Sequence, residues 1–132
     1  MRALLDTSAS YAFASPSDQH HAEARAVFRR PGLQLVTTSI VVGETYTLLN
    51  DRHGYGMAMR WAEALHASAL TEAVHLGASE EVQIWETLRA FAGVPLSYQD
   101  ASLIVLGRLL HLNDIFTFDS DFRQAGMHVV PG

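Results

Sequence analysis

Four carboxylates in this chain occupy positions where an acidic side chain is unexpected. Asp6 ends a short apolar run at the N-terminus, and Asp119 follows a second strand-like run near the C-terminus. Asp100 lies at the start of an otherwise apolar helical segment, and Glu44 has no basic neighbour for several residues on either side. A carboxylate in apolar surroundings needs a hydrogen-bond partner, a cation or solvent. These four residues are therefore the first candidates for chemistry.

Carboxylates that converge on one pocket favour a divalent cation between them. At a separation of about 5 Å and an effective dielectric constant near 20, each pair repels by roughly 3 kcal/mol. Oxygen ligands without cysteine or clustered histidine suit Mg²⁺ or Mn²⁺ better than Zn²⁺. Such ions bind phosphate oxygens and activate water. The chemistry indicated by this set of acids is hydrolysis of a phosphodiester.

Each acid also has a structural interpretation. Asp6 and Asp119 could each cap the N-terminus of a helix, and Asp100 could complement a helix dipole. Glu44 could be an ordinary surface position on an amphipathic helix. It is the joint pattern of the four acids that favours a site.

A parallel sheet would bring these residues together. The apolar run before Asp6 is typical of a strand buried on both faces, and in open α/β sheets the functional residues lie beyond the carboxyl ends of the strands. The pattern predicts one α/β domain over residues 1–132, a three-layer α/β/α arrangement with a mainly parallel sheet of four or five strands. Further strands are predicted at 33–37, 71–76, 115–118 and 127–130, and helices at 7–14, 19–30, 40–50, 57–70, after 77–79, and at 99–112 and 119–124.

Two finer expectations concern the ends and faces of helices. The segment 51–54 is predicted to be a loop, because it follows the helix that ends near Asn50 and contains Gly54. In the helix after 77–79, the apolar side chains recur at helical spacing and are expected to line its inner side. They are Val82, Trp85, Leu88 and Phe91. Trp61 and Trp85 are interpreted as core or dimer-contact residues.

Composition narrows the class of protein. The 132 residues are 48% hydrophobic and 17% charged, which fits a compact globular chain. The net charge of −5 argues against a general nucleic-acid coat protein, though not against a nuclease with a concentrated acidic site. Without cysteine there is no disulfide, thiolate nucleophile or Cys-ligated zinc. No apolar segment reaches the roughly 18–20 residues that span a membrane, and a cytoplasmic location is expected.

All nine basic residues are arginines, and this disfavours two competing enzyme classes. Haloacid-dehalogenase-like phosphatases and response-regulator receiver domains cluster acids around Mg²⁺, but both require a lysine. The phosphatases also need an acid two residues after the first one, where this chain has Ser8. The glycine patterns of dinucleotide-binding and P-loop proteins are absent from the sequence.

The acidic motifs resemble those of the PIN domain, and more narrowly those of the VapC-type toxins of bacterial toxin–antitoxin modules. The resemblance covers nearly the whole chain and depends on four segments in the family's order and spacing. They are Leu5-Asp6-Thr7-Ser8, Thr38-Ser39 followed by Glu44, Asp100-Ala101, and Thr117-Phe118-Asp119-Ser120-Asp121-Phe122.

The resemblance implies an endoribonuclease that depends on Mg²⁺ or Mn²⁺ and forms no covalent intermediate. By position, Asp6 and Asp100 are the expected direct metal ligands. Glu44 and Asp119 are expected to complete the catalytic site, by contacting the metal or by orienting the attacking water. Asp121 is an outer acid that could also reach the metal.

Other residues are candidates for substrate contacts. Thr7, Ser8 and Thr117 could hydrogen-bond an acid or a phosphate. Arg25 and Arg29, four residues apart on one helix, could contact RNA phosphates, although a solvated helix face explains them as well. Asp18, His20 and His21 are interpreted as surface residues rather than metal ligands.

The family also implies partners. VapC-type proteins form homodimers and are inhibited by a VapB antitoxin whose tail lies along the toxin and covers the active site. Apolar residues of the early helices could form that groove or simply the core: Tyr11, Phe13, Val27, Phe28, Tyr46 and Leu49. Two alternatives stay open, a non-catalytic PIN-like binding module and a PIN nuclease of RNA processing outside a toxin system. Transfer, ribosomal and messenger RNA are all compatible substrates.

Overall fold

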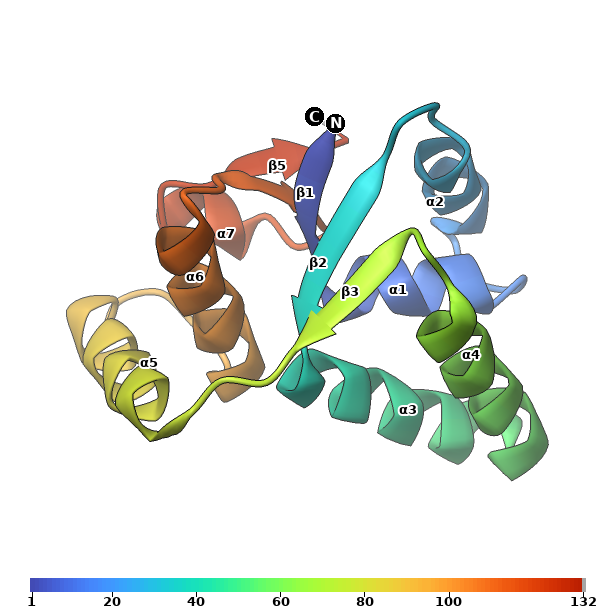
Figure 1. The fold of residues 1–132 in the computed structure, drawn as a ribbon, viewed down its shortest axis with the longest axis horizontal. Helices are drawn as coiled ribbons and strands as arrows, with labels where there is room; N and C mark the ends of the chain where they lie inside the picture. The colour runs from blue at the N-terminus through green and yellow to red at the C-terminus, as the bar shows by residue number, and fades with distance from the viewer. Residues whose placement is uncertain (132) are drawn as a thin grey trace.

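A computed structural model describes residues 1–131, which form a five-stranded parallel sheet with helices on both faces (Figure 1). The strand order is β3-β2-β1-β4-β5, and all four neighbouring pairs are parallel. The strands are β1 Arg2–Leu5, β2 Gln34–Thr38, β3 Thr71–Val74, β4 Asp114–Phe116 and β5 His128–Val130. The helices are α1 Thr7–Ala14, α2 His21–Phe28, α3 Ser39–His53, α4 Tyr55–Ala67, α5 Ala78–Ala90, α6 Tyr98–Leu110 and α7 Asp121–Gln124. The predicted α/β class with a mainly parallel sheet is confirmed.

The three layers follow from the alternation of side chains along the central strand β1. Leu4 points to one face, where it packs with Leu103 and Leu106 of α6 and Phe122 of α7. Its neighbours Ala3 and Leu5 point to the other face and pack against α1 and α2. Figure 1 shows the same division, with α5, α6 and α7 on one side of the sheet and α1 and α2 on the other.

Helix α3 lies at the carboxyl end of the sheet, directly after β2. The side chain of Thr38 accepts a hydrogen bond from the backbone N–H of Val41 (3.2 Å) and so caps the helix. The helix continues to His53, so the prediction of a loop at 51–54 is wrong for its first three residues. The chain leaves the helix at Gly54, whose φ of 92° is a conformation that favours glycine.

Two other predictions differ from the structure. Strand β4 ends at Phe116 rather than Phe118, so Asp119 lies in the turn that follows the strand and not at its end. In α5 the buried positions are Ile84 and Thr87, whereas Val82 and Trp85 are 56% and 49% exposed. Trp61 packs against the small core between α1, α3 and α4, as expected. Among residues 1–131, no helix is long and apolar enough to cross a membrane.

Candidate functional site

The carboxyl ends of the central strands open into a cavity of about 390 Å³ that is lined by all four predicted acids. Asp6 follows β1, Glu44 comes from α3, Asp100 from the first turn of α6, and Asp119 from the turn after β4. These residues are separated by up to 113 positions in the sequence, and only the parallel sheet brings them to one edge. The convergence expected from the sequence is therefore present.

Asp6 is the most buried of the four acids, with 4% of its surface exposed. Its Oδ2 atom accepts hydrogen bonds from the hydroxyls of Thr117 (2.7 Å) and Ser8 (2.8 Å), and a longer one from the Ser8 backbone (3.4 Å). Burial raises the pKa of Asp6, and the bonds from Thr117 and Ser8 oppose that rise. Asp6 also caps α1, so its structural interpretation is confirmed, and the same carboxylate lines the cavity.

When Asp6 is ionised, the hydroxyl groups of Ser8 and Thr117 both donate their protons to it and have none left for another acceptor. Each hydroxyl has one proton to donate. Ser8 Oγ in turn accepts from the backbone of Phe118 (2.9 Å), and Thr117 Oγ1 accepts from the backbone of Asp119 (3.0 Å). Ser8 and Thr117 therefore hold an acid in place and connect α1 to the turn after β4.

Asp100 is anchored by the cap of its own helix. Ser97 Oγ accepts from the Asp100 backbone (3.0 Å), while Asp100 Oδ2 accepts from the Ser97 backbone (2.9 Å). Burial raises the pKa of Asp100 to about 6; the bonds to Ser97 oppose the rise, and the charges of Asp6 and Asp119 add to it. The carboxylates thus interact electrostatically across the cavity.

Glu44 and Asp119 are each held through one oxygen atom. Gln99 Nε2 donates to Glu44 Oε2 (2.6 Å) and so connects α6 to α3. Asp119 Oδ1 accepts from the backbone of Asp121 (2.9 Å). In this way all four acids are positioned by protein donors, and each carboxylate has a second oxygen that these bonds do not use.

Of the remaining predicted site residues, Thr7 lines the cavity, whereas Asp121, Arg25 and Arg29 lie outside it. Asp121 does not line the cavity, but burial and then the charge of Asp119 raise its pKa. Thr7 lines the cavity and is 7% exposed; its Oγ1 is the one buried side-chain polar atom among residues 1–131 without a hydrogen-bond partner. Arg25 and Arg29 are exposed at the end of α2 and do not line the cavity.

Six residues that the sequence analysis did not assign to the site line the same cavity: Tyr11, Asp18, His20, Leu48, Arg52 and Ser97. His20 lies flat on the ring of Phe118, with the ring centroids 4.3 Å apart and the planes at 5°. Helical spacing contained a signal for Arg52, since Glu44, Leu48 and Arg52 recur every four residues along α3 and all line the cavity.

The donor set fits a hard divalent cation such as Mg²⁺ or Mn²⁺. The four acids offer only oxygen atoms, and neither ion pair found among residues 1–131 includes one of them. Burial, which raises the pKa values of Asp6 and Asp100, disfavours their charged forms unless a cation is near. In the part of the chain that the structure describes, no three acidic or histidine side chains already form a closed metal-binding cluster. The chemistry of the site therefore suits a metal, and the protein anchors the donors individually.

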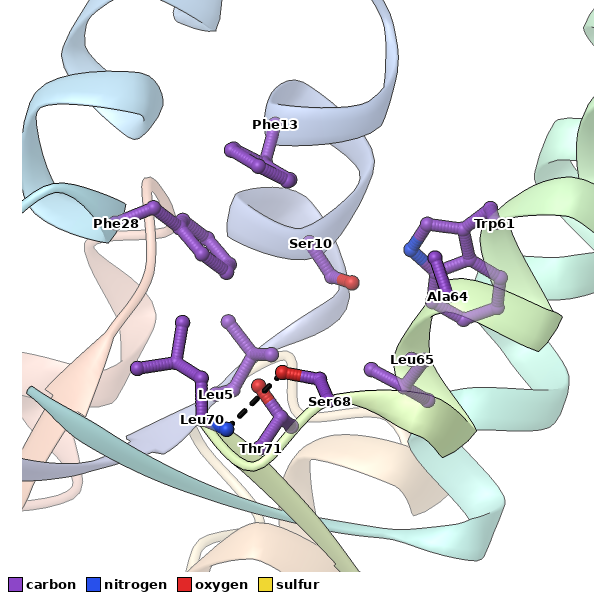
Figure 2. Close-up of a pocket in the computed structure, with 10 residues that line it drawn as sticks. All are labelled: Leu5, Ser10, Phe13, Phe28, Trp61, Ala64, Leu65, Ser68, Leu70 and Thr71. Atoms are coloured by element: carbon purple, nitrogen blue, oxygen red, sulfur yellow. Dashed lines mark hydrogen bonds between the residues drawn. The ribbon is translucent and has the colours of Figure 1, made fainter.

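A second cavity, of about 230 Å³, is almost wholly apolar and lies between α1, α2, α4 and the start of β3 (Figure 2). Phe13 and Phe28 stack at 3.9 Å on one side of it, and Trp61 lies across from them. Of the residues considered for a partner groove, Phe13 and Phe28 line this cavity, while Val27 and Leu49 belong to the core and Tyr11 lines the acidic cavity.

Known proteins resemble the chain along nearly its whole length. The family model of the PIN domain matches residues 3–127. The 23S rRNA-specific endonuclease VapC20 of Mycobacterium tuberculosis is 32% identical over 123 residues, which are 93% of each chain. The crystal structure of the same VapC20, described as a sarcin–ricin loop cleaving toxin, aligns with a TM-score of 0.89, 30% identity and 97% of each chain. FitAcB from Neisseria gonorrhoeae shares the fold at a TM-score of 0.64 and 19% identity, over 98% of this chain and 96% of its own.

Proposed function

The chain belongs to the PIN-domain family, among its VapC-type ribonucleases, and we propose that it cleaves the sarcin–ricin loop of 23S ribosomal RNA in a reaction that depends on Mg²⁺ or Mn²⁺. One observation carries the proposal: Asp6, Glu44, Asp100 and Asp119 line a single cavity at the carboxyl edge of the sheet. The likeness to a nuclease of that specificity, over 93% of both chains, supports the choice of RNA.

In the proposed site, Asp6 and Asp100 hold the metal, and Glu44 and Asp119 complete its surroundings. A bound ion supplies charge neutralisation, a binding point for phosphate oxygens and a lowered pKa for water. Asp121 supports Asp119 from outside, in keeping with its hydrogen bond and its raised pKa.

The protein's own residues position the reactants. Water attacks phosphorus in line; the new P–O bond forms as the bond to the 3′ oxygen breaks, and the products carry 5′-phosphate and 3′-hydroxyl ends. Glu44, oriented by Gln99, accepts the proton lost by water, and the 3′ oxygen takes up a proton from solvent. Thr7 Oγ1, which has no partner among residues 1–131, donates to a phosphate oxygen.

Partners follow from the same assignment. We assign the apolar cavity of Figure 2 to the antitoxin of a VapB type, because apolar side chains of α1, α2 and α4 form its walls and its residues Leu5 and Ser10 directly precede Asp6 and Tyr11 of the acidic cavity in the sequence. The exposed Val82, Trp85 and Leu109 are the apolar surface available to a second copy of the chain. The toxin acts as one domain in the cytoplasm, where its ribosomal substrate and its antitoxin are found.

The proposal is tested with a hairpin RNA that carries the sarcin–ricin loop. We expect the purified protein to cut it with Mg²⁺ or Mn²⁺ and not with EDTA. Asp6→Asn should lower the cleavage rate at least about 100-fold, because even the residues that support metal ligands are worth 10- to 100-fold. Glu86→Gln, which removes an equal charge at an exposed position of α5, is the matched control and should cut normally.

Three results would contradict the proposal. Binding of the hairpin without cleavage in any metal would favour a non-catalytic module. Cleavage of precursor RNAs but not of the hairpin would favour a processing nuclease. Full activity of Asp6→Asn would show that the site is assigned wrongly.

A further inference from the structure

Arg52 is the one arginine among the residues that line the acidic cavity. It lies in the last turn of α3, eight residues after Glu44 and on the same face of the helix. That spacing corresponds to about 12 Å along the helix axis. Arg52 therefore lines a different part of the cavity from Glu44, about two helical turns further along α3.

The guanidinium of Arg52 is not neutralised by the acids around it. The cavity is lined by five carboxylates, because Asp18 joins the four site acids. Even so, the ion pairs found among residues 1–131 both join a histidine to an acid, and neither includes an arginine. Because Arg52 shares the cavity with five acids and forms no ion pair with any of them, its charge and its N–H donors are available to another anion.

Tyr11 holds the guanidinium in this position. The Arg52 Cζ atom lies 5.0 Å from the centre of the Tyr11 ring, which is a cation–π contact. The ring is fixed in turn, because it is 9% exposed and its hydroxyl contacts His53 Nε2 at 3.1 Å. The same nitrogen contacts Ser15 Oγ at 3.1 Å, so His53 and Ser15 together stabilise the Tyr11 ring.

The chemistry of this arrangement suits a phosphate. The planar fork of arginine matches two phosphate oxygens at once, and a guanidinium stacked on a ring is preorganised for such binding. A polyanion that approaches five carboxylates is repelled unless a fixed cation compensates. Arg52 supplies that cation within the same cavity, about two helical turns along α3 from Glu44, on the side where a phosphate flanking the one to be cleaved would lie.

We propose that Arg52 binds an RNA phosphate next to the scissile one, and that Tyr11 holds its guanidinium there for that purpose. This inference rests on the proposed ribonuclease function. It makes Arg52 a substrate-binding residue and Tyr11 a positioning residue, and neither takes part in proton transfer.

The test is steady-state cleavage of the sarcin–ricin hairpin by the full chain with Mg²⁺ or Mn²⁺ over a series of salt concentrations. Arg52→Gln should raise KM about tenfold, as expected for the loss of a charge-assisted hydrogen bond, and change kcat less than about twofold. The slope of log(kcat/KM) against log[salt] should become shallower by about one unit.

Three further variants separate the role of Arg52 from general effects. Arg52→Lys keeps the charge but not the fork, and should lie between wild type and Arg52→Gln. Tyr11→Leu removes the ring and should raise KM in the same direction, whereas Tyr11→Phe keeps the ring and should retain most of the affinity. Arg89→Gln removes an exposed arginine at the end of α5, outside the cavity, and should leave KM and the salt slope unchanged.

The outcomes distinguish the two proposals. If wild type cleaves the hairpin and Arg52→Gln has the wild-type KM and salt slope, the role of Arg52 is overturned and the ribonuclease function stands. If Arg89→Gln loses as much affinity as Arg52→Gln, the effect is general electrostatics and the site-specific role is overturned. If folded wild type neither binds nor cleaves the hairpin, both proposals fail.

Discussion

At the scale of single residues, two of the acids that cap helices are also acids of the candidate site. Asp6 caps α1 and Asp100 forms a capping box with Ser97, so the structural interpretations of these acids are correct. Both carboxylates nevertheless line the cavity, because a helix that starts at the carboxyl edge of a parallel sheet brings its N-terminal residues there. Sequence spacing could predict the convergence of the acids. It could not predict which oxygen of each acid the protein would hold.

The burial of Asp100, together with the charges of Asp6 and Asp119, predicts a dependence of stability on pH. Asp100 has a pKa of about 6 in the folded protein, against 3.8 for an ordinary aspartate, so the folded state binds this proton more tightly than the unfolded state does. The stability associated with Asp100 is therefore greatest below the lower value, and it is lost as pH rises towards the higher value.

Asp100→Asn removes this pH-dependent loss of stability, and its amide oxygen can still accept the hydrogen bond from the Ser97 backbone N–H. In EDTA near pH 7.5, the variant should melt at a higher temperature than wild type, and near pH 4.5 the difference should shrink. Thermal unfolding followed by circular dichroism measures both, with Glu86→Gln as the exposed control. A lower melting temperature for Asp100→Asn near pH 7.5 would show that the negative charge of Asp100 does not destabilise the folded state.

At the scale of elements, the helices were predicted well in position and less well in orientation. Val82, Trp85 and Leu88 recur at helical spacing, yet of the three only Leu88 packs against the core, beside the buried Ile84 and Thr87. Thr87 is tolerated there because its hydroxyl donates to the Gln83 carbonyl and accepts from Arg108. Two faces of α5 carry apolar residues, and only the contact with α6 decides which one is buried.

Arg52 was missed for a related reason. Gly54 indicated a break, and the loop was predicted to start at 51 rather than at the glycine itself. The extra turn of α3 is what carries Arg52 to the cavity. An error of three residues at a helix end therefore concealed a residue of the site.

Close packing of α6 gives a prediction about Gly107. A Cβ atom at this position would lie 2.7 Å from the Leu112 carbonyl oxygen and 3.0 Å from Leu4 Cδ1. We expect Gly107→Ala to destabilise the protein by about 1–3 kcal/mol, because overpacking outweighs the gain in helix propensity. Urea unfolding measures the change in free energy.

The matched control is Gly43→Ala, inside α3, where a Cβ would meet nothing within 4 Å. This variant should be stabilised by roughly 0.5–1 kcal/mol, the ordinary benefit of alanine over glycine in a helix. Equal effects of the two substitutions would mean that the close approach at Gly107 is not rigid.

At the scale of the whole molecule, the fold class could be predicted because strands and helices alternate along the chain. The partners of individual side chains could not, since they come from distant segments. The hydroxyl of Thr117 reaches Asp6 across 111 positions, and Gln99 reaches Glu44 across 55. Such pairs depend on the strand order and on where each helix lies over the sheet.

A negatively charged protein that concentrates its acids in one cavity should be stabilised by the ion it binds. Binding to the folded state alone adds about 2.7 kcal/mol at a metal concentration 100 times the dissociation constant. We expect Mn²⁺ to raise the melting temperature of wild type and not that of an Asp6→Asn, Asp100→Asn double variant. Equal shifts in both proteins would place the bound metal outside the acidic cavity.

The hydrogen bond between Asp6 and Thr117 also bears on when the candidate site is assembled during synthesis. Asp6 is synthesised before its supporting hydroxyl, which follows 111 residues later. Asp100 and Asp119 also come long after Asp6, so a nascent chain that has not yet passed Asp119 carries no assembled site. Since long-range contacts of this kind form slowly, the proposed activity appears only after these late residues have been synthesised and packed. A chain that terminates before Thr117 therefore lacks both the support of Asp6 and the proposed activity.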